Sequence, residues 1–244
     1  MSHGTNNILT LLDPELVVFP DTANALEDPD GLLAVGGDLT PEWLLAAYRR
    51  GIFPWFSDDQ PILWWSPSAR CVVRPQTLNF SRSLRKVIRQ GRYQVTFDRA
   101  FEAVMEACAA PRADQAGTWI TEEMRDAYGA MHRLGYAHSI ETWLNGELVG
   151  GLYGLAIGRI FFGESMFHRA TDASKVAFAH LARQLASWGC EFIDCQVSNP
   201  HTLSLGAEEL PRAEFESILR GEVDKQGFPT AWPSAPSPGL FDTP

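Results

Sequence analysis

The spacing of hydrophobic and polar positions divides the chain into helical segments and one strand-rich stretch. Apolar residues three or four positions apart predict helices over residues 41–50, 81–90, 98–109, 121–134, 172–188 and 211–220. Thr40 and Pro41 suit the start of the first helix, and Gly51 suits its end. Residues 1–30 carry three prolines, so we expect this segment to be irregular.

Runs of β-prone residues follow one another between positions 137 and 168. The runs "AHSIETWL", "ELVGGLYGLA" and "IFFGESMF" are joined by Asn-Gly at 145–146 and Gly-Arg at 158–159, which are hairpin signals. They predict an antiparallel meander of three strands. The helix over 172–188 and a strand over 191–198 add a strand-helix-strand crossover, and this order is the layout of the GNAT acyltransferase architecture.

A polar loop leads into an aromatic-rich segment near residue 70, where we expect a domain boundary. The fold class is therefore α+β, with a smaller N-terminal α/β domain over residues 1–70. A GNAT-like acyltransferase domain is expected over residues 71–225. Residues 226–244 form a proline-rich tail, whose composition predicts mobility.

Length and composition indicate an ordinary globular protein. The chain has 244 residues, of which 45% are hydrophobic. Its longest uncharged apolar stretch, residues 148–158, is too short to span a bilayer, and no secretory signal is present, so we expect a cytoplasmic protein without membrane contact. The four cysteines have neither CxxC nor zinc-site spacing, which predicts reduced thiols and no metal.

The net charge of −10 argues against a nucleic-acid partner, but one segment has the opposite character. Residues 79–92 contain no acid and the following bases: Arg82, Arg85, Lys86, Arg89 and Arg92. A solvated helix face would explain this block, and so would a small phosphate-binding patch. Composition alone leaves both interpretations open.

Polar side chains interrupt two of the predicted strands. Regular alternation puts Glu164 on one face with Phe162 and Met166, where an unpaired charge would cost several kcal/mol. Glu164 therefore needs a partner, a raised pKa or a cationic ligand. Asp194 and Gln196 share a face of "EFIDCQVSN". These groups could form a site, or they could satisfy backbone donors and a nearby arginine.

Several catalytic motifs are absent from the sequence. It has no GxxxxGK[ST], GxGxxG, HExxH or GxSxG segment, which disfavours NTP hydrolysis, dinucleotide chemistry, zinc proteolysis and the hydrolase triad. The junction "FHRATDASKVAF" lacks the glycine-rich phosphate loop that an acetyl-CoA user of this fold is expected to carry. Four tryptophans in "FPWF", "LWWSP" and "TWI" could be core residues or could stack on an adenine.

Long segments of the chain resemble the bacterial leucyl/phenylalanyl-tRNA-protein transferase family. They are "GLLAVGGDLTPEWLLAAYRRGIFPWFSDDQPILWWSPSAR", "GTWIT", "GYAHSIETW", "GELVGGLYG", "FFGESMF", "DASK" and "IDCQVSNPHTLSLGA", and they run from about residue 15 to 220. The resemblance implies an enzyme that transfers Leu or Phe, and less readily Met, from aminoacyl-tRNA to a protein α-amine. The implied acceptors begin with Arg or Lys, and the product is an N-end rule degradation signal.

The resemblance also implies roles for individual residues. The family's catalytic pair matches Asp194 and Gln196, and its pocket glutamate matches Glu164. Its aminoacyl pocket and terminal-adenosine site match these positions: Trp55, Trp119, Leu152, Met166 and Ile193. A methionine replaces Leu152 in one member, which predicts a modest change in side-chain preference.

Regular alternation points Ile193 away from Asp194. A twist or bulge would let both reach one cavity; otherwise Ile193 is core behind it. Because the family binds the acceptor end of tRNA, the resemblance favours phosphate binding by the basic block, at Arg82, Arg85, Lys86 and Arg89.

The implied chemistry needs no cofactor, because an aminoacyl ester is already activated and reacts once the amine is deprotonated and placed. Asp194 could orient Gln196, but an amide is a very weak base, so the proton acceptor stays open and could be the ribose 2′-hydroxyl. Two other functions remain to be tested, a coenzyme A-dependent acetyltransferase and a non-catalytic tRNA-binding module. We expect a monomer, since no sustained heptad is present.

Overall fold

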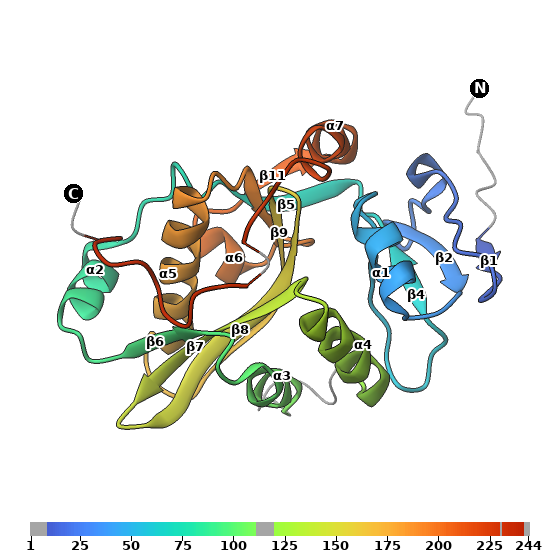
Figure 1. Cartoon of the computed structure of the whole chain (residues 1–244). Coiled ribbons are helices and arrows are strands. Elements are labelled where there is room, and N and C mark those ends of the chain that lie inside the picture. Colours follow the sequence, from blue (N-terminus) through green and yellow to red (C-terminus); the bar gives the residue numbers. More distant parts are fainter. Residues whose placement is uncertain (1–8, 111–119, 230, 242–244) are drawn as a thin grey trace.

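The computed structural model describes residues 9–110, 120–229 and 231–241, and within them the chain forms two β-sheets flanked by helices (Figure 1). The smaller sheet has the strand order β1-β2-β4-β3. Its elements are β1 (Thr10–Leu12), β2 (Leu32–Gly36), β3 (Phe53–Pro54) and β4 (Leu63–Trp65), with helix α1 (Pro41–Tyr48) and the short 3-10 helix η1 (Thr22–Asn24). The segment expected to be irregular thus contains β1 and η1. Sequence spacing missed β1 because a three-residue strand is defined by its parallel pairing with β2.

The larger sheet has the order β11-β5-β10-β9-β8-β7-β6. Its strands are β5 (Ala69–Val73), β6 (Gln94–Phe97), β7 (Ala137–Leu144), β8 (Glu147–Ile157), β9 (Ile160–His168), β10 (Phe192–Asp194) and β11 (Glu208–Pro211). The accompanying helices are α2 (Arg82–Arg89), α3 (Phe101–Ala109), α4 (Glu122–Arg133), α5 (Ala173–Ser187), α6 (Pro200–Ser204) and α7 (Arg212–Glu222).

The predicted meander and crossover are confirmed. Strands β7, β8 and β9 pair antiparallel, and α5 carries the chain to β10, which pairs parallel with β9. The mixture of segregated helices with a mostly antiparallel sheet confirms the α+β class and its GNAT-like order. The expected long helices are present because their signals are local; for example, the Thr121 side chain accepts a hydrogen bond from the Met124 amide at the start of α4.

Two hydrophobic clusters cover the faces of the larger sheet. The first cluster joins α1, α3 and α4 to one face and includes Tyr48, Tyr128 and Phe162. The second cluster lies between the opposite face and α5 and includes Phe161 and Val176. Because alternate residues of β9 enter different clusters, the sheet forms the middle layer (Figure 1).

Strand β9 carries a bulge at Glu164 that sequence periodicity did not predict. Tyr153 of β8 pairs with Ser165 and the next residue, Gly154, pairs with Gly163, so Glu164 has no partner in register. The extra residue reverses the alternation. Phe162 therefore packs in the first cluster and Met166 packs against the second, and the prediction that Phe162, Glu164 and Met166 share one face is wrong.

A second irregularity follows β10, which ends at Asp194 and not at residue 198 as predicted. The Cys195 amide donates to the Cys71 carbonyl at 2.8 Å, and the Cys71 amide donates to the Gln196 carbonyl at 3.0 Å. Cys195 and Gln196 thus lie opposite the single residue Cys71, which is a β-bulge. Gln196 has a left-handed backbone with φ of 56°. Asp194 and Gln196 do not share a face of one regular strand.

The described residues of the proline-rich tail pack against β6 and α5, contrary to the predicted mobility. The Phe97 amide donates to the Ser234 carbonyl at 3.1 Å, and the Ser237 amide donates to Gln184 Oε1 at 2.8 Å. Trp232 is buried and stacks on His138, with ring centroids 4.1 Å apart. The high proline content suggested mobility. Composition does not show that a single aromatic side chain, Trp232, packs against the fold.

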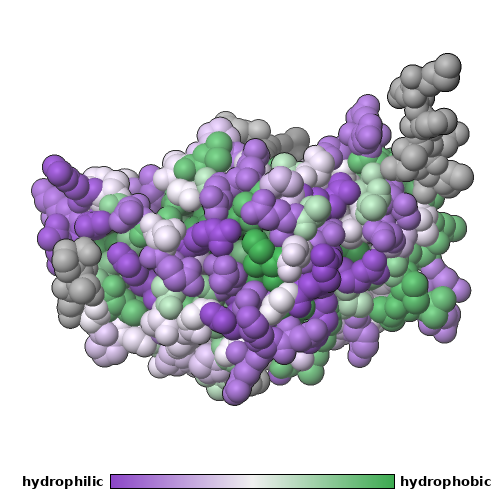
Figure 2. Space-filling view, turned by 90° about the horizontal axis from the view of Figure 1, so that it is seen from above, coloured by the Kyte–Doolittle hydropathy of each residue, from purple (hydrophilic) through white to green (hydrophobic). Residues whose placement is uncertain are grey.

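The face in Figure 2 is mostly hydrophilic, and its hydrophobic side chains lie in separate patches. Within the described ranges, no helix has both the length and the apolar character required to cross a membrane.

Candidate active site

Glu164, at the β9 bulge, accepts hydrogen bonds from side chains of two helices and lies close to a third side chain in the segment after β10. Tyr48 Oη of α1 donates to Oε1 at 2.7 Å, and Tyr128 Oη of α4 donates to Oε2 at 3.1 Å. The amide Nε2 of Gln196 lies 3.4 Å from Oε1. An acid in these surroundings requires partners, and tyrosine hydroxyls and a carboxamide supply them.

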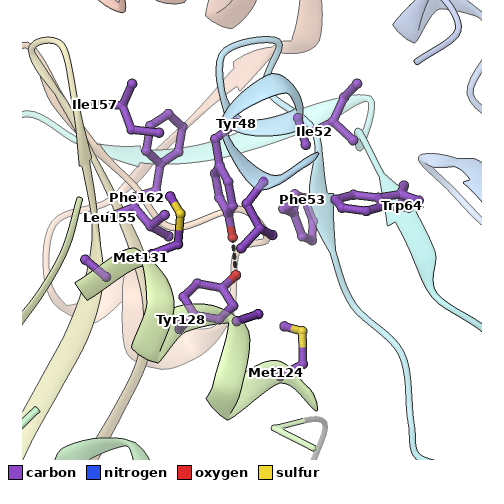
Figure 3. Close-up of a cluster of buried hydrophobic side chains, with 14 of the residues drawn as sticks. Tyr48, Ile52, Phe53, Trp64, Met124, Tyr128, Met131, Leu155, Ile157 and Phe162 are labelled. Carbon is purple, nitrogen blue, oxygen red and sulfur yellow. Dashed lines mark hydrogen bonds between the residues drawn. The ribbon is translucent and has the colours of Figure 1, made fainter. Parts of the chain in front are cut away.

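The two tyrosines reach Glu164 from inside the first hydrophobic cluster. Figure 3 shows their hydroxyls facing each other between α1 and α4, among Met131, Leu155 and Phe162. Tyr48 and Tyr128 are fully buried, and their hydroxyl oxygens also lie within hydrogen-bond distance of one another. Because each hydroxyl has a single hydrogen, a bond between the tyrosines replaces one of the bonds that they donate to the Glu164 carboxylate. Helical spacing gives this arrangement, because Tyr48 lies on the buried face of α1 with Leu44, and Tyr128 lies on that of α4. The amphipathic faces of these helices therefore position the hydroxyls.

The environment of Glu164 moves its titration into the neutral range. Burial raises the pKa of Glu164 from 4.5 to about 7, and the charge of Asp194 also raises it. The hydrogen bonds from Tyr48 and Tyr128 and the charge of Arg70 lower the same pKa but do not offset the burial. The carboxyl group can therefore exchange a proton near neutral pH, which suits acid-base chemistry.

Asp194 forms a buried ion pair with Arg70. The guanidinium donates from Nε to Oδ1 at 2.8 Å and from Nη2 to Oδ2 at 2.7 Å, and both residues are at most 1% exposed. Arg70 also donates from Nη1 to the Gly51 carbonyl at 3.0 Å and lies over the rings of Phe53 and Phe215. Both charges are thus paired, which a buried location requires.

Asp194 also determines the backbone of Gln196. Its Oδ1 accepts a hydrogen bond from the Gln196 amide at 2.9 Å, which supports the left-handed conformation of that residue. This turn directs the Gln196 carboxamide to Glu164, since Asp194 pairs with Phe162 and the two chains continue side by side. The structure therefore brings Asp194, Gln196 and Glu164 together, through two bulges that simple alternation does not describe.

The predicted aminoacyl-pocket residues occupy different environments. Leu152 and Ile193 are buried in the second cluster, and Met166, directly opposite Leu152, is half-buried at its edge. His201 Nε2 lies 3.0 Å from Met166 Sδ. Trp55 is 49% exposed beside Trp65, and Trp119 lies outside the described residues.

The basic block forms one face of α2. Arg82, Lys86 and Arg89 are exposed, whereas Arg85 is half-buried and donates to the Phe80 carbonyl at 3.1 Å. Helix α2 packs against α5, at the end of the molecule opposite the smaller sheet (Figure 1). The structure therefore separates these cations from Tyr48 of α1, which lies beside the smaller sheet (Figure 1).

Sequence reasoning missed Arg70, Tyr48 and Tyr128 as candidate site residues. Arg70 precedes the apolar run "CVV" in a strand, and a charged residue in such a run was a signal that it needs an acidic partner. The tyrosines gave no signal beyond their positions on apolar helix faces. Within the described ranges, no group of histidine, cysteine and acidic side chains is arranged to hold a metal ion.

Comparisons with known proteins identify what the chain is similar to. The sequence model of the family described as "Leucyl/phenylalanyl-tRNA protein transferase" matches residues 72–220, and the model of that family's N-terminal domain matches residues 37–68. A solved GCN5-related N-acetyltransferase-like protein from Streptococcus suis aligns with a TM-score of 0.31 and 14% identity, over 70% of this chain and 65% of that one. This likeness is too distant to support a functional comparison.

Three proteins named leucyl/phenylalanyl-tRNA--protein transferase are much closer. The Azoarcus sp. strain BH72 protein is 64% identical over 214 residues, which cover 88% of this chain and 91% of the relative. The Aromatoleum aromaticum protein is 59% identical, with coverages of 88% and 90%. The Saccharophagus degradans protein is 58% identical over 218 residues, with coverages of 89% and 90%.

Proposed function

The chain belongs to the leucyl/phenylalanyl-tRNA protein transferase family, and we propose that its acceptors are proteins that begin with Arg or Lys. Membership makes it an aminoacyltransferase that moves Leu or Phe from tRNA to protein. We propose further that Met is transferred less readily and that the product is an N-end rule degradation signal. The hydrogen-bonded set of Glu164, Gln196 and Asp194 is the observation that supports catalysis by this chain.

Asp194 acts in this proposal as a positioning residue. Both of its carboxylate oxygens already accept hydrogen bonds from Arg70, and Oδ1 also accepts from the Gln196 amide. Asp194 is also fully buried behind the Arg70 guanidinium, so it is poorly placed to contact the substrate amine. Its contribution is to hold the Gln196 carboxamide beside the incoming amine.

Glu164 is the titratable group best suited to interact with that amine. Its pKa of about 7 leaves a large carboxylate fraction at neutral pH, and its Oε1 lies within 3.4 Å of Gln196 Nε2. A carboxylate attracts the ammonium form of the acceptor and can then accept a proton as the amide bond forms. The 2′-hydroxyl of the terminal ribose is the alternative proton relay.

The substrate positions in this proposal come from the resemblance to the family. The aminoacyl side chain is proposed to lie near Met166, with Leu152 and Ile193 buried behind it and Trp55 at the surface. Trp119 belongs to the terminal-adenosine site in this proposal. Helix α2 binds tRNA phosphates through Arg82, Arg85, Lys86 and Arg89, away from the reacting ester.

The remaining features of the proposal concern organisation. We propose a small N-terminal domain over residues 1–70, a catalytic domain over residues 71–225 and a tail over residues 226–244. The protein works as a monomer in the cytoplasm in this proposal. It needs no cofactor, since the ester supplies the free energy for amide formation.

One assay tests the proposed function. Radiolabelled Phe-tRNA is incubated with the protein and with an acceptor protein that begins with Arg, and the label is located by N-terminal sequencing. The matched control is the same acceptor with an acetylated N-terminus, which has no free α-amine. Label at the Arg N-terminus and none on the control supports the proposal; absence of label from both contradicts it. Transfer from acetyl-CoA instead would favour the acetyltransferase, and binding of tRNA without transfer would favour a binding module.

A further inference from the structure

Two cysteines lie opposite one another beside the candidate active site. Cys71 follows Arg70 in β5, and Cys195 stands between Asp194 and Gln196. The Cys195 amide donates to the Cys71 carbonyl at 2.8 Å, so the two residues face each other on adjacent antiparallel segments. Neighbouring strands bring Cα atoms to about 4.5–5.5 Å, which lies within the range that a disulfide spans.

The two side chains influence one another's titration. Interaction with Cys195 lowers the pKa of the Cys71 thiol, and interaction with Cys71 raises the pKa of the Cys195 thiol. Cys71 Sγ also lies 3.7 Å from Thr202 Oγ1. A sulfur with a lowered pKa is the more nucleophilic partner of such a pair.

Access to the pair is from one side. Cys71 is fully buried, whereas Cys195 is partly exposed to solvent. A small oxidant can therefore reach the pair at Cys195, and a macromolecular reagent cannot reach Cys71. Two adjacent thiols, one of them accessible, are the arrangement found in redox-sensitive sites.

We propose that Cys71 and Cys195 form a reversible disulfide on exposure to a hydroperoxide, and that this bond switches off the transfer reaction. The loss of activity rests on the proposed function, whereas formation of the bond does not. The inference gives this chain a redox-sensitive modification site inside its catalytic region.

The oxidation balances with hydrogen peroxide as the only co-reactant. The Cys71 thiolate attacks one peroxide oxygen, the O–O bond breaks, and a sulfenic acid on Cys71 and a hydroxide form. The neighbouring thiol then displaces the sulfenic oxygen, which leaves as water, and the S–S bond forms. In total, two thiols and one peroxide give one disulfide and two waters, and a dithiol reductant reverses the bond.

The bond would disturb the groups that position Gln196. A disulfide holds its sulfurs about 2.05 Å apart, much closer than thiols in hydrogen-bonded contact, so one chain must move toward the other. Cys195 is covalently joined to both Asp194 and Gln196, and the Asp194 side chain accepts from the Gln196 amide at 2.9 Å. Because misplacing a catalytic group by about 1 Å can cost on the order of a hundredfold in rate, we expect transfer to fall about tenfold or more.

The test treats the full-length protein with hydrogen peroxide and measures two quantities. Peptide mapping without reduction detects a Cys71–Cys195 crosslink, and the Phe-tRNA assay measures transfer before oxidation, after oxidation and after dithiothreitol. The expected result is a crosslink that accompanies the loss of transfer, with recovery of both changes on reduction. Transfer by the reduced protein is measured first, so failure of the proposed function is recognised separately from failure of the crosslink.

The variants Cys71→Ala and Cys71→Ser remove the buried partner, and two are used because one of them could fold poorly. Each is expected to transfer Phe when reduced and to lose less than about twofold under the same peroxide treatment, because Cys195 then has no partner. Cys108→Ala serves as the matched control and should stay as peroxide-sensitive as the unmodified chain. Absence of the crosslink, a crosslink that leaves transfer unchanged, or equal peroxide sensitivity of the Cys71 variants would each overturn the inference.

Discussion

The guanidinium of Arg70 holds the carboxylate of Asp194 through parallel hydrogen bonds of 2.8 and 2.7 Å, with both residues removed from water. Arg70 also contacts Gly51, Phe53 and Phe215, so one side chain links the segment after α1, strand β3, helix α7 and β10. The packing around Arg70 therefore fixes the Asp194 carboxylate. Asp194 in turn binds the backbone amide of Gln196 and so determines where Gln196 lies.

Breaking the ion pair from one side should destabilise the protein strongly. Arg70→Met or Asp194→Leu leaves one buried charge unpaired, which typically costs about 3–5 kcal/mol. The double variant should lose less than the sum of the two, because neither charge remains. Urea unfolding of all four proteins measures this coupling. Additive losses would show that the two charges do not depend on each other.

In the same four proteins, transfer activity should not recover in the double variant as stability does. The double variant still lacks the Asp194 carboxylate that binds the Gln196 amide, so we expect transfer at least about tenfold below that of the unmodified protein even where the fold is retained. A double variant that is folded and fully active would contradict the positioning role of Asp194.

The free energy of unfolding should depend on pH through Glu164. Burial raises the pKa of this carboxyl from 4.5 to about 7 in the folded protein, and unfolding exposes it to water and restores the lower value. The folded state thus binds a proton more tightly, so unfolding releases a proton between these two pH values. The contribution of Glu164 to stability is fully present below this window and is lost as pH rises through it.

Glu164→Gln isolates this contribution because the amide does not titrate. The difference in unfolding free energy between the two proteins, measured by urea denaturation from pH 4.5 to 8, should move in favour of the variant as pH rises. Curves that stay parallel across this range would exclude a raised pKa at Glu164. Other titrating groups cancel in the difference.

Removing either tyrosine hydroxyl should shift this titration upward. Tyr48 and Tyr128 donate hydrogen bonds to Glu164 and lower its pKa. Tyr48→Phe and Tyr128→Phe should therefore each destabilise the ionised carboxylate and raise the pKa of Glu164. A hydrogen bond to a charged group is worth about 1.5 kcal/mol or more, which corresponds to a shift of about one pH unit.

Carbon NMR of the labelled Glu164 carboxyl measures the midpoint directly. Tyr93→Phe is the matched control, because its hydroxyl donates to the Thr171 carbonyl and does not contact Glu164. An unchanged midpoint in both Tyr48→Phe and Tyr128→Phe would show that these hydroxyls do not stabilise the carboxylate.

The parts of the fold that the sequence predicted are those set by local signals. Helices α4 and α5 follow from apolar spacing, with a capping Thr121 at the start of α4, and the β7-β8-β9 meander follows from its turn residues. The bulge at Glu164 depends on how β9 pairs with β8, which no short segment of sequence determines. Alternation was therefore correct up to Glu164, which faces the first cluster with Phe162, and wrong from the bulge onward, at Met166.

The candidate site was predictable only in part for the same reason. The sequence indicated Asp194, Gln196 and Glu164 as candidates because they are polar residues in apolar strands. Their roles came from the resemblance to the transferase family. Arg70 lies 124 residues before Asp194, and pairing at that separation is a property of the folded sheet. Such partners are found only when the strand order is known.

The basic helix should contribute to tRNA binding without contributing to chemistry. Arg82→Glu combined with Lys86→Glu reverses two exposed charges on α2, so tRNA affinity should fall. The plot of log affinity against log salt should become shallower by about 0.7–0.9 for each phosphate that the variant no longer binds. Filter binding over a salt series measures both quantities.

Arg220→Glu with Lys225→Glu makes the same change in net charge at exposed positions near α7. This control should leave the salt slope unchanged, because a general charge effect would act equally on both variants. Equal decreases in affinity in the two proteins would assign the effect to net charge and return the α2 block to a solvated helix face.

The packed tail should stabilise the fold through Trp232. Its indole ring contacts Phe97, His138, Phe161 and Trp188, and it is 8% exposed. Trp232→Ala removes this packing and leaves a cavity, which should lower the free energy of unfolding by about 3–5 kcal/mol. Urea denaturation measures the change.

The variant Trp232→Phe separates packing from hydrogen bonding at this position. The indole Nε1 has no hydrogen-bond partner among the described residues, so a phenylalanine keeps the aromatic packing and removes a buried donor that is unsatisfied there. Its destabilisation should therefore be much smaller than that of Trp232→Ala. Equal destabilisation would show that the indole N–H has a partner, and unchanged stability in both variants would mean that the tail does not hold this position in solution.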